Sequence, residues 1–74
     1  MKLVKFKIIK DYIFDLYFED GLKKHIDLYN LIGLKVSKNE LNSAYIDTEW
    51  GCLEFKNGLV DIEPKTLYEW VKTN

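Results

Sequence analysis

Apolar and polar side chains alternate along most of residues 3–28, a period of two that is typical of β-strands with one buried face. The first predicted strand begins at Leu3, and its inward residues are expected to be Val4, Phe6 and Ile8. The inward residues of the second are expected to be Tyr12, Phe14, Leu16 and Phe18. Those of the third, Leu22–Leu28, are expected to be Leu22, Ile26 and Leu28. Asp20-Gly21 tolerates positive φ and predicts a two-residue type I′ turn, which makes the three strands an antiparallel meander.

Shorter elements are predicted in the middle of the chain. They are a helical turn at residues 29–33, a helix from Lys38 to about Ser43, and strands at residues 45–48, 52–56 and 59–61. The helical turn ends at Gly33, and Ser37 and Glu40 have the spacing of a capping box in front of the helix. Asn57-Gly58 predicts a second type I′ turn between the last two strands.

The C-terminal segment predicts an amphipathic helix with a proline, Pro64, in its first turn. A buried stripe is expected at i, i+3 and i+4, formed by Leu67, Trp70 and Val71. Asp61 or Glu63 is expected to cap the helix. The chain is therefore expected to form one α+β domain over residues 1–74. In this small two-layer fold an antiparallel sheet, a three-stranded N-terminal meander plus further short strands, packs against the C-terminal helix.

The charge balance argues against nucleic acid as the default partner. Eleven lysines and twelve acidic residues give a net charge of -1, so no global positive field favours a phosphate backbone. The absence of arginine removes bidentate guanidinium contacts. Cys52 is the only cysteine, so no intramolecular disulfide can form, and a reducing cytoplasm is the expected compartment. No apolar run reaches the ~20 residues of a membrane span and the N-terminus does not resemble a signal peptide, so no membrane partner is expected.

Few residues offer chemistry, and neither a catalytic residue nor a cofactor is predicted. His25 is the only histidine and is expected to face solvent beside Asp27 rather than to act as a base. A zinc site would need Cys52, His25 and carboxylates without the usual Cys-x-x-Cys or His-x-x-x-His spacing, so no metal site is predicted. Glu49 and Glu54 lie close to Cys52 in the sequence and disfavour a reactive thiolate. An enzyme built on His25 and Cys52 is the least favoured hypothesis.

Aromatic residues give the main indication of a binding surface. Trp50 lies in an expected turn, and Tyr17 and Tyr45 fall on strand faces opposite the apolar ones, where an exposed aromatic side chain is often a binding anchor. Trp50 fits equally well as a lid folded onto the core. Strand alternation also suggests a lysine-bearing sheet face as a candidate nucleic-acid surface, formed by Lys5, Lys7, Lys23 and Lys24.

Several segments follow the pattern of a known family. They are Phe18-Glu19-Asp20-Gly21, Asp27-Leu28 with Leu31, Phe55-Lys56-Asn57-Gly58, and Asp61-Ile62-Glu63-Pro64-Lys65-Thr66-Leu67-Tyr68-Glu69. In their order and spacing they resemble the bacterial family numbered 2442 among the domains of unknown function, over nearly the whole chain. Phe55 stands where the family usually has tryptophan, and one extra residue separates Gly58 from Asp61.

The resemblance implies a small α+β fold, no established enzymatic activity and no accepted catalytic residues. Members of the family occur alone, beside small toxin-like genes or fused to helix-turn-helix domains, which implies a regulatory or antitoxin-like partnership. The leading hypothesis is therefore a non-catalytic interaction module with a protein partner. The alternative is a nucleic-acid-binding accessory protein that uses the lysine-bearing face. A homodimer through an edge strand stays open, because an unpaired edge can bind its own copy.

Overall fold

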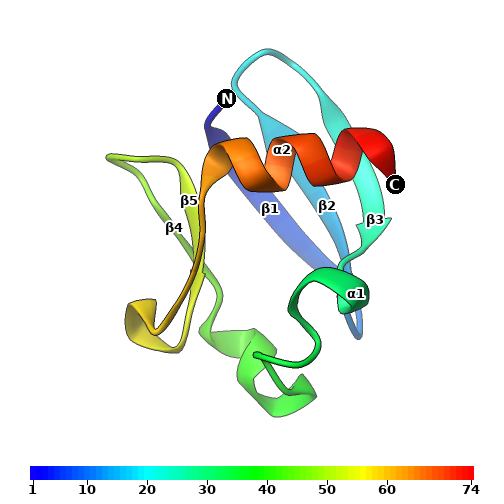
Figure 1. Cartoon of the computed structure of the whole chain (residues 1–74), viewed down its shortest axis with the longest axis vertical. Helices are drawn as coiled ribbons and strands as arrows, with labels where there is room; N and C mark the ends of the chain where they lie inside the picture. The colour runs from blue at the N-terminus through cyan, green and yellow to red at the C-terminus, as the bar shows by residue number, and fades with distance from the viewer.

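The computed structural model describes all 74 residues and places six strands in two three-stranded antiparallel sheets (Figure 1). The first sheet consists of β1 (Leu3–Lys10), β2 (Ile13–Phe18) and β3 (Lys23–Asp27), in that order. The second consists of β4 (Tyr45–Asp47), β5 (Cys52–Phe55) and β6 (Val60–Ile62), in that order. The helices are α1 (Tyr29–Ile32), the short 3₁₀ helices η1 (Lys38–Ser43) and η2 (Lys56–Gly58), and α2 (Pro64–Thr73). The predicted α+β class, N-terminal meander and C-terminal helix are confirmed, and the further strands form a sheet of their own.

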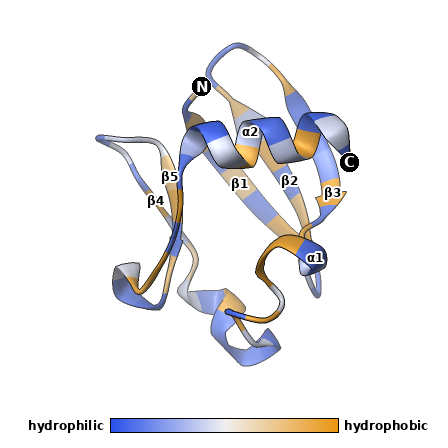
Figure 2. Cartoon of the chain, viewed as in Figure 1, coloured by the Kyte–Doolittle hydropathy of each residue, from blue (hydrophilic) through white to orange (hydrophobic).

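One hydrophobic core joins the two sheets to α2, which crosses one face of the first sheet (Figure 1). Its fully buried residues come from β2, β5 and α2 among other segments, and include Phe14, Leu16, Leu53, Phe55, Leu67 and Val71. Hydrophobic residues recur along these elements (Figure 2). The rings of Phe14 and Phe55 meet edge to face with their centroids 6.3 Å apart, a favourable aromatic geometry. This contact joins the two sheets directly.

The first strand departs from strict alternation at Val4. Leu3 pairs with Phe18 and Lys5 pairs with Tyr17, so Val4 is an extra residue on β1, a β-bulge. The bulge turns Leu3 into the core and leaves Val4 exposed. The prediction that Val4 is buried is therefore wrong, because a pattern of simple alternation cannot reveal an inserted residue.

The first hairpin has a three-residue loop rather than the predicted two-residue type I′ turn. Asp20 does not have positive φ, whereas Gly21 has a φ of 92°. The Gly21 N–H donates to the Phe18 carbonyl, which is the geometry of a turn followed by one left-handed glycine. The burial of apolar side chains explains why the three-residue loop forms instead of the two-residue turn. A two-residue turn would pair Phe14 with Asp27, whereas the observed register pairs Phe14 with Ile26 and keeps apolar residues on one face.

The second predicted turn is present but belongs to a wider loop. Asn57 and Gly58 both have positive φ, and the Leu59 N–H donates to the Lys56 carbonyl, as in a type I′ turn. Lys56 also has positive φ, so the strand pairing ends one residue earlier, at Phe55. Leu59, the predicted first residue of the last strand, therefore lies in the loop, and 82% of the residue is exposed.

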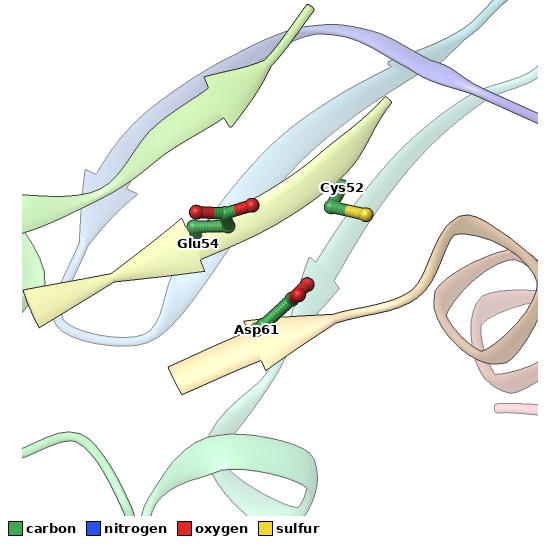
Figure 3. Close-up of side chains that lie close together, drawn as sticks. All are labelled: Cys52, Glu54 and Asp61. Carbon is green, nitrogen blue, oxygen red and sulfur yellow. The ribbon is translucent and has the colours of Figure 1, made fainter. Parts of the chain in front are cut away.

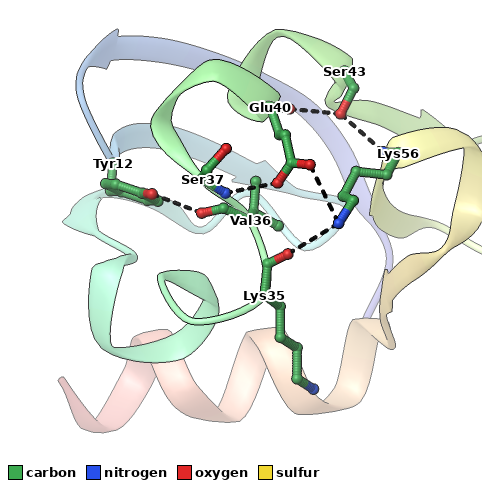
Figure 4. Close-up of polar contacts among 7 residues, drawn as sticks. All are labelled: Tyr12, Lys35, Val36, Ser37, Glu40, Ser43 and Lys56. Carbon is green, nitrogen blue, oxygen red and sulfur yellow. Dashed lines mark hydrogen bonds and ion pairs between the residues drawn. The ribbon is translucent and has the colours of Figure 1, made fainter.

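Hydrogen bonds fasten the segment between the two sheets (Figure 4). The Tyr12 hydroxyl donates to the Val36 carbonyl at 2.6 Å. The Ser37 N–H donates to the Glu40 carboxylate at 2.9 Å, the contact that the capping-box spacing predicts, and it lowers the pKa of Glu40. The Lys56 ammonium lies 3.3 Å from the same carboxylate. The start of η1 is thus tied to η2 at the end of β5, and the segment before it to the turn between β1 and β2.

The C-terminal helix begins at its predicted proline and buries Leu67 and Val71, whereas Trp70 is only half-buried. Glu63 occupies the N-cap position, but no side-chain hydrogen bond caps the helix, and Asp61 belongs to β6. The predicted side-chain cap is therefore wrong. Glutamate is not among the residues that favour the N-cap position, whose shorter side chains accept hydrogen bonds from the first free N–H groups of the helix. No helix has the length and apolarity needed to cross a bilayer.

Candidate functional site

A hollow of about 550 Å³ lies over the outer face of the second sheet. Its lining comes from the N-terminus, the β4–β5 turn, β5, β6 and the start of α2. Acidic side chains dominate this lining, which includes Asp47, Glu54, Asp61 and Glu63. We call it the acidic hollow. Two lysines, Lys2 and Lys65, also contribute to it.

The strand register gathers three metal-ligating side chains in this hollow (Figure 3). Glu54 on β5 pairs directly with Asp61 on β6. Cys52 precedes Glu54 by two residues and therefore shares its face of the sheet. One ligand atom from each of the three residues lies within 4.8 Å of the other two.

This cluster combines burial with negative charge. Only 9% of Glu54 is exposed, and the Tyr45 hydroxyl donates to its Oε1 at 2.5 Å. That hydrogen bond raises the pKa of Tyr45 above its ordinary value. The three ion pairs of the chain involve Asp11, Asp15 and Glu40, so no cation pairs with a carboxylate of the acidic hollow.

The thiol of Cys52 is buried in the same place, with 7% of the residue exposed. Burial, with a further contribution from the charge of Asp61, raises the pKa of Cys52 to about 11. The group is therefore a neutral thiol at pH 7 and lacks the thiolate form that a nucleophile needs. The expectation that glutamates surround Cys52 holds for Glu54, but Asp61 rather than Glu49 is the second acidic neighbour.

Trp50 is the exposed aromatic residue at the acidic hollow. It lies in the β4–β5 turn with 62% of the residue exposed, so it is not a lid on the core. Asp47 shapes the turn, because its carboxylate accepts hydrogen bonds from the backbone N–H groups of Glu49 and Trp50. Gly51 follows with a φ of 76°. Trp50 is thus held beside the acidic side chains by the local backbone.

Of the other two aromatic candidates, Tyr45 lies on the same sheet as Trp50 and Tyr17 does not. Tyr45 lies on β4 with its hydroxyl committed to Glu54. Tyr17 lies on the first sheet, on the face opposite the core. The structure therefore brings Tyr45 and Trp50 to the second sheet and leaves Tyr17 on another surface.

Three of the four candidate lysines share the outer face of the first sheet. Lys5 and Lys23 pair with Tyr17 from either side, and their ammonium groups lie 5.2 and 5.3 Å from the centre of its ring. Lys7 is on the same face, on β1. Lys24 pairs with the buried Leu16 and therefore points to the opposite face. The prediction that all four lysines share one face is wrong for Lys24, because Lys23 and Lys24 are adjacent on one strand.

His25 is exposed on the outer face of the first sheet, as expected. Its Nδ1 lies 2.6 Å from the Asp15 carboxylate, a neighbour across the strands rather than the expected Asp27. Cys52 lies in the acidic hollow, whose lining does not include His25. The structure therefore does not bring the only histidine and the only cysteine together.

A second hollow of about 340 Å³ was not anticipated from the sequence. We call it the apolar hollow, because its lining includes Leu31, Leu59, Val60 and Ile62. It shares Asp61 and Glu63 with the acidic hollow, so the two hollows meet along β6. The cluster of Cys52 with two carboxylates was also missed. The Asn57-Gly58 turn was the available signal, because a hairpin centred there places Glu54 opposite Asp61.

Comparison with known proteins identifies one family. Residues 3–73 match the family described as Protein of unknown function (DUF2442). Neither the curated proteins nor the solved structures include a match. The match covers nearly the whole chain, including both sheets and all of α2. The chain therefore belongs to the DUF2442 family of proteins of unknown function.

Proposed function

We propose that the protein is a non-catalytic interaction module that binds a partner protein across β6, in an antitoxin-like two-protein system. The observation that carries the proposal is the pair of hollows that meet along this edge strand. Each has a large exposed hydrophobic residue in its lining, Trp50 in the acidic hollow and Leu59 in the apolar hollow. Exposed aromatic and aliphatic side chains beside concave surfaces are typical anchors of protein interfaces.

The negative charge of the acidic hollow indicates which kind of partner segment would bind there. Four carboxylates line the acidic hollow against two lysines, and none of the four has an ion pair. A partner segment that carries lysine or arginine would complement this charge, and apolar side chains next to them would fill the apolar hollow. We therefore expect the bound segment to be basic and amphipathic.

The antitoxin-like form of this proposal is motivated by the family resemblance, which implies members that occur beside small toxin-like genes. A cytoplasmic location is consistent with it, because the single cysteine is free and buried. The absence of a reactive thiolate and the separation of His25 from Cys52 favour binding over catalysis.

The test is co-purification from the source cell with nuclease treatment, followed by binding measurements on the isolated complex. Trp50→Ala and Leu59→Ser are each expected to lose about 2 kcal/mol of binding free energy, roughly thirtyfold in affinity. Leu34→Ser is the matched control, because Leu34 is 99% exposed and lines neither hollow. A stoichiometric partner that binds all three variants equally well would refute the proposed surface.

A second function rests on a different observation, the row formed by Lys5, Tyr17 and Lys23. Two ammonium groups beside an aromatic ring resemble a platform for single-stranded nucleic acid. Lys5→Ala and Lys23→Ala are then expected to weaken binding to an oligonucleotide, whereas Lys24→Ala, on the opposite face, is not. Binding should fall steeply with added salt, and no retention of DNA or RNA at low salt would dismiss this function.

A further inference from the structure

The Cys52, Glu54 and Asp61 side chains form a compact set of metal donors. One atom from each lies within 4.8 Å of the others. A tetrahedral zinc ion lies about 2.3 Å from a sulfur ligand and about 2.1 Å from a carboxylate oxygen, so its ligands are roughly 3.5 Å apart. For a zinc ion to bind, the donors must therefore approach one another by about 1 Å through side-chain rotation.

The buried thiol distinguishes this donor set from a cluster of carboxylates alone. Cys52 is 93% buried, since 7% of it is exposed, and it forms no disulfide. Its sulfur lies on the side of the sheet from which Glu54 and Asp61 extend (Figure 3). A thiol packed for its apolar character would face mainly aliphatic side chains, whereas this one lines a hollow to which four acidic residues also contribute.

The Tyr45 hydroxyl acts as a support for the same site. It donates to Glu54 Oε1 at 2.5 Å from the neighbouring strand, where Tyr45 pairs with Glu54. Ligating carboxylates in metal proteins are commonly held by such hydrogen bonds, which fix their orientation. Tyr45 is therefore a positioning residue for Glu54.

We propose that Cys52, Glu54 and Asp61 bind a divalent metal ion of borderline softness, with zinc as the best fit to one sulfur and two oxygen donors. Thiolate ligands select against magnesium and calcium, which prefer oxygen alone. On binding, the thiol releases its proton to solvent and the sulfur donates an electron pair to the metal, without a redox change. The hollow leaves a fourth position open to water or to a ligand from another molecule.

The experiment uses the full chain under reducing conditions and titrates it with cobalt(II) chloride, which reports sulfur ligation by a charge-transfer band, and with zinc(II) chloride by calorimetry. We expect one ion per chain. Cys52→Ser should abolish the band, and Cys52→Ser and Asp61→Asn should each weaken zinc binding by at least about tenfold. Tyr45→Phe should keep the band and weaken binding by about tenfold. Asp61 is exposed, so its variant tests the site without the risk of emptying the core.

Glu63→Gln is the control, because Glu63 lines the hollow but lies outside the donor set. Its zinc affinity should match that of the unchanged chain. The proposal would be overturned if no cobalt band appeared. It would also be overturned if neither Cys52→Ser nor Asp61→Asn weakened zinc binding. The measurement needs no partner, and Trp50 and Leu59 are not ligands. The metal site and the proposed interaction surface can therefore fail independently.

Discussion

At the scale of single residues, the Tyr68 hydroxyl links α2 to the first hairpin. It donates to the Asp20 carboxylate at 2.5 Å and, with a further hydrogen bond from the Leu22 N–H, lowers the pKa of Asp20 below its ordinary 3.8. A carboxyl group whose pKa is lower in the folded chain than in the unfolded chain stabilises the fold at pH values above its unfolded pKa. This contribution disappears as the pH falls through the folded pKa. Tyr68→Phe should therefore lower the urea midpoint at pH 7, and its difference from the unchanged chain should shrink below pH 3.8.

Tyr29→Phe is the matched control for this prediction. Tyr29 is an exposed tyrosine whose ring approaches Tyr12 edge to face, a contact that phenylalanine retains. Its urea midpoint should follow that of the unchanged chain at both acidic and neutral pH. A midpoint difference for Tyr68→Phe that stays constant with pH would mean that the hydroxyl does not hold the charged form of Asp20.

At the scale of elements, the β4–β5 turn depends on Gly51. Its φ of 76° is left-handed, and a Cβ placed there would lie 2.5 Å from the Cβ of Lys2 and 2.9 Å from its Cα. Gly21 also has positive φ, but a Cβ there would meet nothing within 4 Å. Gly21→Ala should therefore lose about 1–2 kcal/mol of unfolding free energy from backbone strain alone. Gly51→Ala should lose clearly more in the same urea titration, and equal losses would show that Lys2 yields freely.

The elements themselves could largely be predicted, because periods of two and 3.6 are local properties of the sequence. Residues 38–43 and the start of α2 are placed as predicted. The details that failed depend on pairing between strands. The bulge at Val4 and the three-residue first loop both follow from register, which is set by what each face of the sheet packs against. Lys24 is different, because alternation along its own strand already places it on the face opposite Lys23.

At the scale of the whole molecule, the site was the least predictable feature. Alternation already places Cys52 and Glu54 on one face, and the second hairpin already places Glu54 opposite Asp61. A local pattern cannot show which other residues pack around these side chains. The later strands form a separate sheet, and the residues around the hollow come from three separate parts of the chain, residues 1–2, 47–54 and 61–65. Only the packing of the two sheets decides that these acidic residues line a hollow.

The contact between Phe14 and Phe55 joins the two sheets, so we expect the whole fold to unfold as one cooperative unit. Phe55→Leu should lower the free energy of unfolding by about 1–2 kcal/mol, since it trims a fully buried ring without polar change. Amide hydrogen exchange should show the same loss of protection in β2 as in β5, because neither sheet has a separate core. A loss confined to β5 would mean that the second sheet opens alone. In that case the acidic hollow would be a locally unfolding surface rather than part of the rigid fold.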